Sequence, residues 1–271
     1  MYHNEKNDPK SPPKPHQDTS AGRDDFIHAV VKKAGPALGV ALTIPSVTVS
    51  RLISQVGYDF VFIDMEHSPL GPEKMTALVH GVVASSRGSC FPLVRVPSQG
   101  VEWIKWALDS GAAGIIVPMV NNQAEMRAIA QHCLYPPRGR RSFGPSNAPW
   151  GLPNGPGGGV GEYVKRASEG KIAILPIIES TESVENVEDI ISIDGVSGVF
   201  IGPIDLRLSL GLSGADGEEP AYKTEDSRGH KKARHCRRKS RIGRECCEEA
   251  GNGRFRFSCC LHRCYEHDQS G

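Results

Sequence analysis

The chain has 271 residues, eight of them Cys, and a formal net charge of +1 at neutral pH. This length suffices for one barrel-sized domain, and the absence of any run of about 18 apolar residues argues against a membrane-spanning helix. The charge is uneven, because residues 221–271 hold 13 Lys/Arg against 7 Asp/Glu while the rest of the chain is mildly acidic. The body therefore gives no general reason to expect a nucleic-acid partner.

The first 22 residues are rich in Lys, Pro, Asn and Asp, and we expect residues 1–22 to form a disordered polar leader. They have no apolar region of the kind that a secretory signal needs. They contain acidic residues and no Arg before Arg23, which argues against a mitochondrial presequence. Only Cys90 and Cys133 lie in the body, where we expect both to be small buried side chains in a reducing compartment. The sequence thus predicts a cytoplasmic protein.

Strand-like and helix-like patterns alternate over the body, residues 23–213. The predicted strands are residues 38–44, 60–64, 91–96, 114–117, 171–178 and 198–201. The predicted helices are residues 25–33, 46–56, 72–86, 101–110, 122–133 and 182–190, with a further turn of helix that ends at residue 210. We interpret the Pro- and Gly-rich residues 135–161 as a long active-site loop. Short buried strands that alternate with helices predict a parallel sheet with right-handed crossovers. Periodicity alone leaves both a closed barrel and an open doubly wound sheet in consideration.

Ionisable side chains follow the predicted strands, at the point where each strand ends. The sequence Asp64-Met-Glu66-His67 comes directly after the apolar run Phe60–Ile63. A buried strand that ends in two carboxylates and an imidazole is costly, and such clusters usually bind a metal, pair with each other or transfer protons. Later strands end in Arg95, Glu179 and Asp205. One ionisable group at each strand end is how a parallel barrel builds an active site.

Each of these residues has both a chemical interpretation and a plain structural one. Glu179 and Asp205 are suited as two oxygen ligands for Mg²⁺ or Mn²⁺, although helix caps and surface carboxylates are common alternatives. Arg95 offers a planar fork for a carboxylate or enolate oxygen, or an ordinary salt bridge at the barrel rim. His67 is a candidate general base with Asp109 as its partner, and Asp109 is otherwise a solvated residue at a helix end.

Six segments of the chain, in the right order, resemble the HpcH/HpaI aldolase family, which includes 4-hydroxy-2-oxoheptanedioate aldolase and 2-dehydro-3-deoxyglucarate aldolase. The resemblance spans roughly residues 25–213. The six segments are Phe60–His67, Leu93–Pro97, Leu108–Pro118, Tyr135–Arg141, Ile177–Glu179 and Phe200–Leu206.

The resemblance implies a (β/α)₈ TIM barrel of the phosphoenolpyruvate/pyruvate type that assembles into homo-oligomers, here truncated after about six βα units. It also implies a carbon–carbon lyase, a class II aldolase that depends on a divalent metal, Mg²⁺ or Mn²⁺ with Co²⁺ as an alternative. Such an enzyme cleaves 2-oxo acid aldols to pyruvate and an aldehyde through a pyruvate enolate held by the metal. By resemblance, the metal ligands are Glu179 and Asp205, and Arg95 binds the keto oxygen. His67, oriented by Asp109, serves the proton transfers. The remaining positions support the site or face the substrate: Asp64, Glu66, Pro118 and Met119.

Two departures from the family pattern bear on acceptor specificity. Ile177 stands where some members have Gln, and Ala41 lies where an aromatic residue is common on the first strand. A CoA-ester lyase of the citrate-lyase type is the alternative enzymatic interpretation, although the pair Glu66-His67 and the loop 138–141 resemble the aldolase branch more.

The tail, residues 214–271, does not continue the pattern. Within residues 221–271 the only Val, Ile, Leu or Met residues are Ile242 and Leu261, and six Cys gather there in a basic context. A zinc site fits the Cys spacing poorly, and a nucleic-acid tail is weakly supported. We favour a shifted reading frame or a retained intron, because a parallel barrel does not simply omit its closing strands. A truncated inactive barrel fragment is the non-enzymatic alternative.

Overall fold

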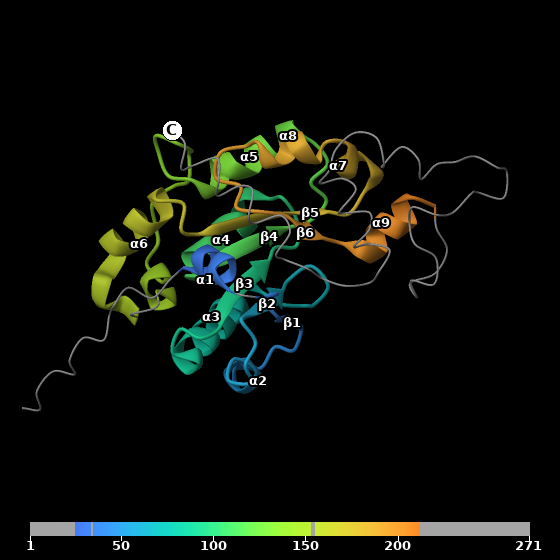
Figure 1. Cartoon of the computed structure of the whole chain (residues 1–271). Coiled ribbons are helices and arrows are strands. Elements are labelled where there is room, and N and C mark those ends of the chain that lie inside the picture. The colour runs from blue at the N-terminus through green and yellow to red at the C-terminus, as the bar shows by residue number, and fades with distance from the viewer. Residues whose placement is uncertain (1–24, 34, 153–154, 212–271) are drawn as a thin grey trace, which may run out of the picture.

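Figure 1 shows the chain as a computed structural model, which describes residues 25–33, 35–152 and 155–211. The predictions for the leader, residues 1–22, and for the tail, residues 214–271, concern segments outside the described residues.

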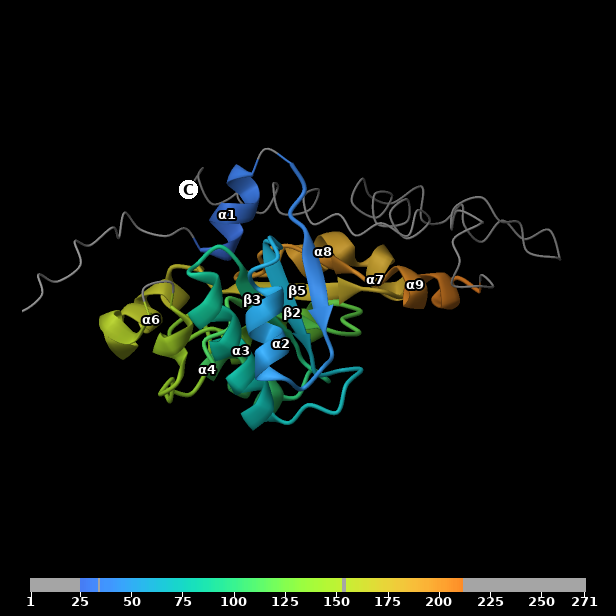
Figure 2. The same ribbon diagram turned by 90° about the horizontal axis from the view of Figure 1, so that it is seen from below.

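Six parallel strands form one sheet in the described part of the chain, and their spatial order β1-β2-β3-β4-β5-β6 follows the sequence. The strands are β1 (Gly39–Leu42), β2 (Phe60–Asp64), β3 (Phe91–Arg95), β4 (Gly114–Val117), β5 (Ala173–Ile178) and β6 (Phe200–Ile201). Parallel strands that neighbour each other in chain order, with helices between them, are the arrangement of a βα barrel. The curled sheet and its helices are drawn in Figures 1 and 2.

Helices connect successive strands, and one more helix lies before β1 and another after β6. They are α1 (Phe26–Lys32), α2 (Val47–Ile53), α3 (Pro72–Ser86), α4 (Val101–Asp109), α5 (Gln123–Cys133), α6 (Gly159–Ser168), α7 (Thr181–Glu185), α8 (Val187–Ile191) and α9 (Pro203–Ser209), with the 3₁₀ turns η1 (Ala148–Gly151) and η2 (Gly155–Gly158). Side chains of α2 to α5, α7 and α8 pack with alternate strand residues such as Val61, Val94 and Ile115 in the larger core. These helices therefore cover one face of the sheet.

The opposite face of the sheet forms a second core, which is the interior of the curl. Its members alternate along the strands with those of the larger core, as the two-residue period of a strand requires. From β2 to β6 they are Phe60, Leu93, Ile116, Ala173, Leu175, Ile177 and Phe200, with Phe62 partly buried beside them. This alternation decides which residues at the strand ends face the interior.

Helix α1 covers the end of the sheet where the strands begin (Figure 2). Its Phe26 ring meets the rings of Phe60 and Phe91, the first residues of β2 and β3, edge to face at 5.8 Å. Asp25 caps this helix by accepting a hydrogen bond from the His28 N–H at 3.0 Å. With the amino ends of the strands occupied by an apolar helix, the carboxyl ends are left for the polar side chains.

The fold class expected from the sequence, a TIM-type barrel with about six βα units, is confirmed for the described residues. Within them β1 pairs only with β2, and β6 pairs only with β5. Cys90 and Cys133 are buried, and burial raises the pKa of each thiol to about 12, in keeping with the expected apolar role. Among the described helices, none combines the length and the apolar character needed to cross a bilayer.

Two local predictions were wrong. No helix was expected between residues 161 and 171, whereas α6 covers most of this segment because Tyr163 and Ala167 supply a buried face. The single helix expected over residues 182–190 is instead α7 and α8, interrupted at Asn186. The Asn186 side chain donates a hydrogen bond to the Asn121 carbonyl at 2.9 Å, which ties this break to the end of β4.

Candidate active site

Charged side chains lie at the carboxyl ends of the strands, on the same inner face as the apolar residues of the second core. Each charged residue lies two positions after an apolar inner-face residue of the same strand: Asp64 after Phe62, Arg95 after Leu93, and Glu179 after Ile177. The β2–β3 register sets Asp64 opposite Arg95. The strand period therefore brings a carboxylate, a guanidinium and a second carboxylate to one end of the interior.

Asp64 and Arg95 form a bidentate ion pair. Arg95 Nε donates to Asp64 Oδ1 at 3.0 Å, and Nη2 donates to Oδ2 at 2.7 Å. Burial pushes the pKa of Asp64 upward, but the hydrogen bond and charge of Arg95, together with the backbone N–H groups of His67 and Glu66, hold that pKa below its usual value. Burial likewise disfavours the charged Arg95, but Asp64 and the charges of Glu66 and Glu179 together outweigh it, so the Arg95 pKa is raised. Both groups are therefore ionised at neutral pH.

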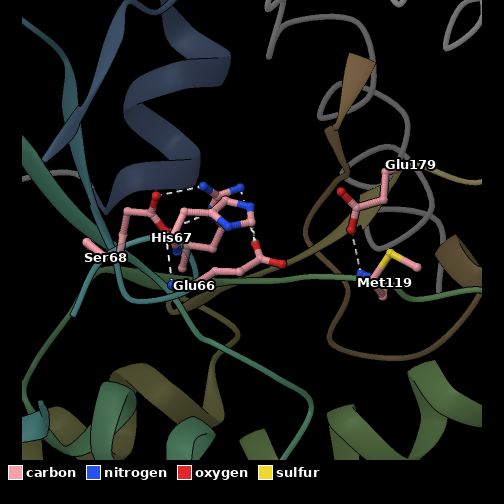
Figure 3. A network of polar contacts seen from close by, with 7 residues as sticks. Glu66, His67, Ser68, Met119 and Glu179 are labelled. Carbon is pink, nitrogen blue, oxygen red and sulfur yellow. Dashed lines mark hydrogen bonds and ion pairs between the residues drawn. The ribbon is translucent and has the colours of Figure 1, made fainter. Parts of the chain in front are cut away.

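The turn after β2 is built on the Asp64 carboxylate. Its Oδ1 also accepts hydrogen bonds from the backbone N–H groups of Glu66 at 3.0 Å and His67 at 3.2 Å. This turn directs Glu66 toward Arg95, whose Nη1 lies 3.2 Å from Glu66 Oε2. The His67 ring projects toward solvent, with 64% of its side chain exposed and Nε2 3.8 Å from the same Glu66 oxygen. Figure 3 shows this group of side chains together.

The Glu66 carboxylate is only partly satisfied. Its Oε2 is buried and, despite the nearby charges, has no aligned hydrogen-bond donor among the described residues. Burial raises the pKa of Glu66, and the charges of Arg95 and His67 oppose that shift without cancelling it. A buried carboxylate oxygen without a donor is costly, so this oxygen is available to a cation or to a donor on a ligand.

Glu179 approaches the same region from β5. Its Oε1 accepts a hydrogen bond from the Met119 N–H at 2.6 Å, at the end of β4 (Figure 3). Its Oε2 faces Gly202, where a Cβ atom would lie only 2.6 Å away. Burial raises the pKa of Glu179; the Met119 hydrogen bond opposes this, and the negative charges of Glu66 and Asp205 add to it. A nearby cation would relieve the excess of negative charge.

Asp205 lies in the first turn of α9, three residues after Gly202, and is exposed. Its charge acts on both Glu66 and Glu179, so the three carboxylates share one region. Within the described ranges, no three His, Cys, Asp or Glu side chains gather closely enough to enclose a metal ion. Two carboxylates with open positions for water and substrate are nonetheless how proteins commonly hold Mg²⁺. The Glu66 oxygen that lacks a hydrogen-bond donor among the described residues and the raised pKa of Glu179 fit such an ion.

Asp109 is not brought to His67 in this chain. It ends α4, on the side of the sheet where β4 begins, whereas His67 follows the carboxyl end of β2. Asp109 instead accepts a hydrogen bond from Arg141 Nη2 at 2.5 Å. Arg141 is buried, with its guanidinium over the Tyr135 ring at 4.6 Å and Nη2 also donating to the Tyr163 hydroxyl at 3.1 Å. Within one chain, the structure therefore gives Asp109 a different partner from the predicted one.

Three residues beside the site were not identified from the sequence. Gln99 and Asn121 donate their side-chain amides to the Met119 carbonyl at 2.7 and 3.2 Å, and neither belongs to a recognisable motif. Gly202 lies against Glu179, and its place between a strand and Pro203 was the available signal. The predicted Pro118 and Met119 lie at this end of β4, and the backbone of Met119, rather than its exposed side chain, contacts Glu179.

Comparison with known proteins identifies the protein family to which the chain belongs. The family model of HpcH/HpaI aldolase/citrate lyase matches residues 45–243, more than half of the chain. The chain belongs to this family.

Individual relatives agree with the family assignment. A hydroxypyruvate/pyruvate aldolase of Rhizorhabdus wittichii is 36% identical over 176 residues, which are 65% of this chain and 66% of that protein. A 4-hydroxy-2-oxovalerate aldolase of Novosphingobium aromaticivorans is 33% identical over 72% of this chain and 71% of its own length. The crystal structure of an HpcH/HpaI aldolase from Desulfitobacterium hafniense DCB-2 superposes with a TM-score of 0.62 at 26% identity, over 73% of this chain and 74% of that one. The chain thus spans about two thirds of the length of the curated relatives it matches.

Proposed function

We propose that the protein is a carbon–carbon lyase, a divalent-metal-dependent aldolase that cleaves 2-oxo acid aldols to pyruvate and an aldehyde. The observation that carries the proposal is the meeting of Glu66, Arg95 and Glu179 at the carboxyl ends of β2, β3 and β5, on one side of the sheet. Relatives named for aldolase reactions on different 2-oxo acids support the reaction class.

Arg95 is suited to hold the oxo-acid end of the substrate. Its Nε and Nη2 are engaged by Asp64, which fixes the plane of the guanidinium. Nη1 faces Glu66 and the interior, where it donates to the keto or carboxylate oxygen of pyruvate. Because Arg95 stays charged, it stabilises the negative charge that develops on the enolate oxygen when the methyl group of pyruvate loses a proton.

His67 is suited to carry the proton. Its exposed ring lies beside Glu66, and an imidazole can both accept and donate a proton in general acid–base catalysis. In the cleavage direction, the base removes the hydroxyl proton of the aldol, the carbon–carbon bond breaks, and the enolate of pyruvate then accepts a proton on its methylene carbon. In this chain Glu66, rather than Asp109, is the carboxylate next to the ring.

Glu179 and Asp205 would hold the divalent cation, and the negative charge of Glu66, which acts on Glu179, would support its binding. When bound, Mg²⁺ or Mn²⁺ supplies a Lewis acid for the keto oxygen. Glu179 is oriented for this role, since one oxygen is held by the Met119 N–H and the other is directed toward the β6 end.

The proposal is tested by the exchange of pyruvate methyl protons with solvent deuterium, followed by NMR in the presence of Mg²⁺ or Mn²⁺. We expect exchange with the unaltered chain and a loss of at least 100-fold in Glu179→Ala. Glu185→Ala removes an exposed glutamate from the same region of the chain and is expected to leave the rate unchanged. Exchange that persists in Glu179→Ala would refute the metal assignment, and its absence in the unaltered chain would refute the aldolase proposal.

A further inference from the structure

Met119, directly after β4, has an unusual backbone conformation. Its φ angle is 54°, in the left-handed region that residues other than glycine seldom adopt. Such a residue costs of order 1 kcal/mol or more and persists only where its surroundings enforce it. The Met119 side chain is half exposed, so side-chain packing does not explain the conformation.

Two side-chain amides hold the Met119 peptide in place. Gln99, from the loop after β3, donates its Nε2 to the Met119 carbonyl at 2.7 Å and also approaches the Pro118 carbonyl at 3.4 Å. Asn121 donates its Nδ2 to the same Met119 carbonyl at 3.2 Å. The carbonyl is therefore held from two sides, while the N–H of the same residue donates to Glu179.

Asn121 is itself anchored to the segment that follows β5. Its Oδ1 accepts a hydrogen bond from the Ser180 hydroxyl at 2.5 Å, and its carbonyl accepts one from Asn186 at 2.9 Å. Its N–H donates to Glu125 at 2.8 Å. Ser180 is the neighbour of Glu179 in the chain, so these bonds join the ends of β4 and β5.

We propose that Gln99 and Asn121 are positioning residues, which hold Met119 in the left-handed conformation so that its N–H fixes the orientation of the Glu179 carboxylate. With Oε1 held in this way, Oε2 is presented on the side of Gly202 and of the α9 turn that carries Asp205. The inference rests on the proposed function, because it concerns the carboxylate that would bind the cation.

Loss of the hydrogen bond from Gln99 is expected to change the orientation of the Glu179 carboxylate while the carboxylate itself stays in the chain. Without the Gln99 amide, Met119 relaxes toward an ordinary φ, its N–H turns away, and Glu179 becomes free to rotate. Groups that orient a metal ligand through a hydrogen bond are typically worth about 10- to 100-fold in metal affinity. The effect is therefore expected in cation binding itself, before any chemistry.

The first experiment replaces Gln99 by Met, which keeps the length of the side chain and removes the amide donor. Mn²⁺ affinity is measured by electron paramagnetic resonance on the full chain, together with kcat and KM for pyruvate exchange. We expect Gln99→Met to bind Mn²⁺ about 10-fold more weakly, with a corresponding loss in kcat. The matched control is Gln123→Met, since the Gln123 amide donates to the Ser192 hydroxyl at 3.3 Å and, among the described residues, makes no hydrogen bond to Met119 or Glu179. Asn121→Leu is a second variant, for which a loss at least as large is expected.

A double-mutant cycle separates this role from a general structural one. Glycine adopts the left-handed conformation without strain and keeps the N–H, so in a Met119→Gly background the Gln99→Met change is expected to cost less than 3-fold. Wild-type Mn²⁺ affinity in both Gln99→Met and Asn121→Leu, or equal losses from Gln99→Met in the two backgrounds, overturns the inference. A chain that binds Mn²⁺ but exchanges no pyruvate protons overturns the proposed function instead, and the Mn²⁺ measurements on Gln99 still decide this inference.

Discussion

Replacement of Gly202 by Ala tests how closely Glu179 must be placed. A Cβ atom at this position would lie 2.6 Å from Glu179 Oε2 and 2.7 Å from the Glu179 Cβ. Ordinary contacts begin near 3.4 Å, so the glutamate must move by roughly 0.8 Å, and contact with its Cβ prevents rotation of the carboxylate alone from relieving the clash. A displacement approaching 1 Å in a catalytic group costs on the order of 100-fold in rate, which is about 2.7 kcal/mol of transition-state stabilisation.

The assay is pyruvate proton exchange, with Mn²⁺ affinity measured in parallel. Gly71→Ala is the matched control, because Gly71 is also a helix N-cap followed by Pro, and a Cβ there meets no atom within 4 Å. We expect Gly202→Ala to lose about 100-fold in kcat/KM and Gly71→Ala to retain wild-type rates. If Gly202→Ala stays folded and keeps exchange within 3-fold of wild type, the argument that Glu179 acts from this position is refuted.

Two further predictions concern stability. Asp64→Asn leaves Arg95 without its buried partner and is expected to lower the free energy of unfolding by about 3 kcal/mol at pH 7. Because the folded pKa of Asp64 is lowered, its stabilisation is present above the unfolded value of 3.8 and is lost as the pH falls through the folded value. Urea titrations should therefore show the two proteins converging below about pH 3.8, and a constant difference down to pH 2 would contradict the assignment. Mn²⁺ at 100 times its Kd should stabilise the wild-type chain by about 2.7 kcal/mol in the same titrations but leave Glu179→Gln unaffected, and equal stabilisation of both would place the cation elsewhere.

The fold was largely predictable because its strands are short, buried and regularly separated by helices. The register of β2 and β3 follows from the same alternation that places Phe62 and Leu93 in the interior. Periodicity could not predict α6, which has two glycines among its first three residues, or the helix break at Asn186. The second depends on a hydrogen bond to Asn121, 65 residues earlier in the chain, and no local pattern encodes it.

Some residues of the candidate site were likewise predictable from the sequence, and others were not. The strand-end positions of Asp64, Arg95 and Glu179 were visible in the sequence, because each follows an apolar run at an even spacing. The partner of Asp109 could not be predicted from the sequence, because its pairing with Arg141 depends on how the loop after α5 returns to the end of α4. The roles of Gln99 and Asn121 were equally hidden, because an amide that binds a backbone carbonyl leaves no compositional signal.

The bidentate pair between Asp64 and Arg95 also bears on how the chain finds its fold. A slip of one residue between β2 and β3 would turn Arg95 toward the helix-covered face, among Val and Ile side chains, with no carboxylate opposite it. A lone guanidinium in that layer would be penalised by several kcal/mol, whereas a slip in a wholly apolar pair of strands would cost far less. The Asp64–Arg95 pair therefore favours this one register of β2 and β3 over registers shifted by one residue. The chain is thus held in register by Arg95, which we expect to bind the substrate, and by the carboxylate that orients it.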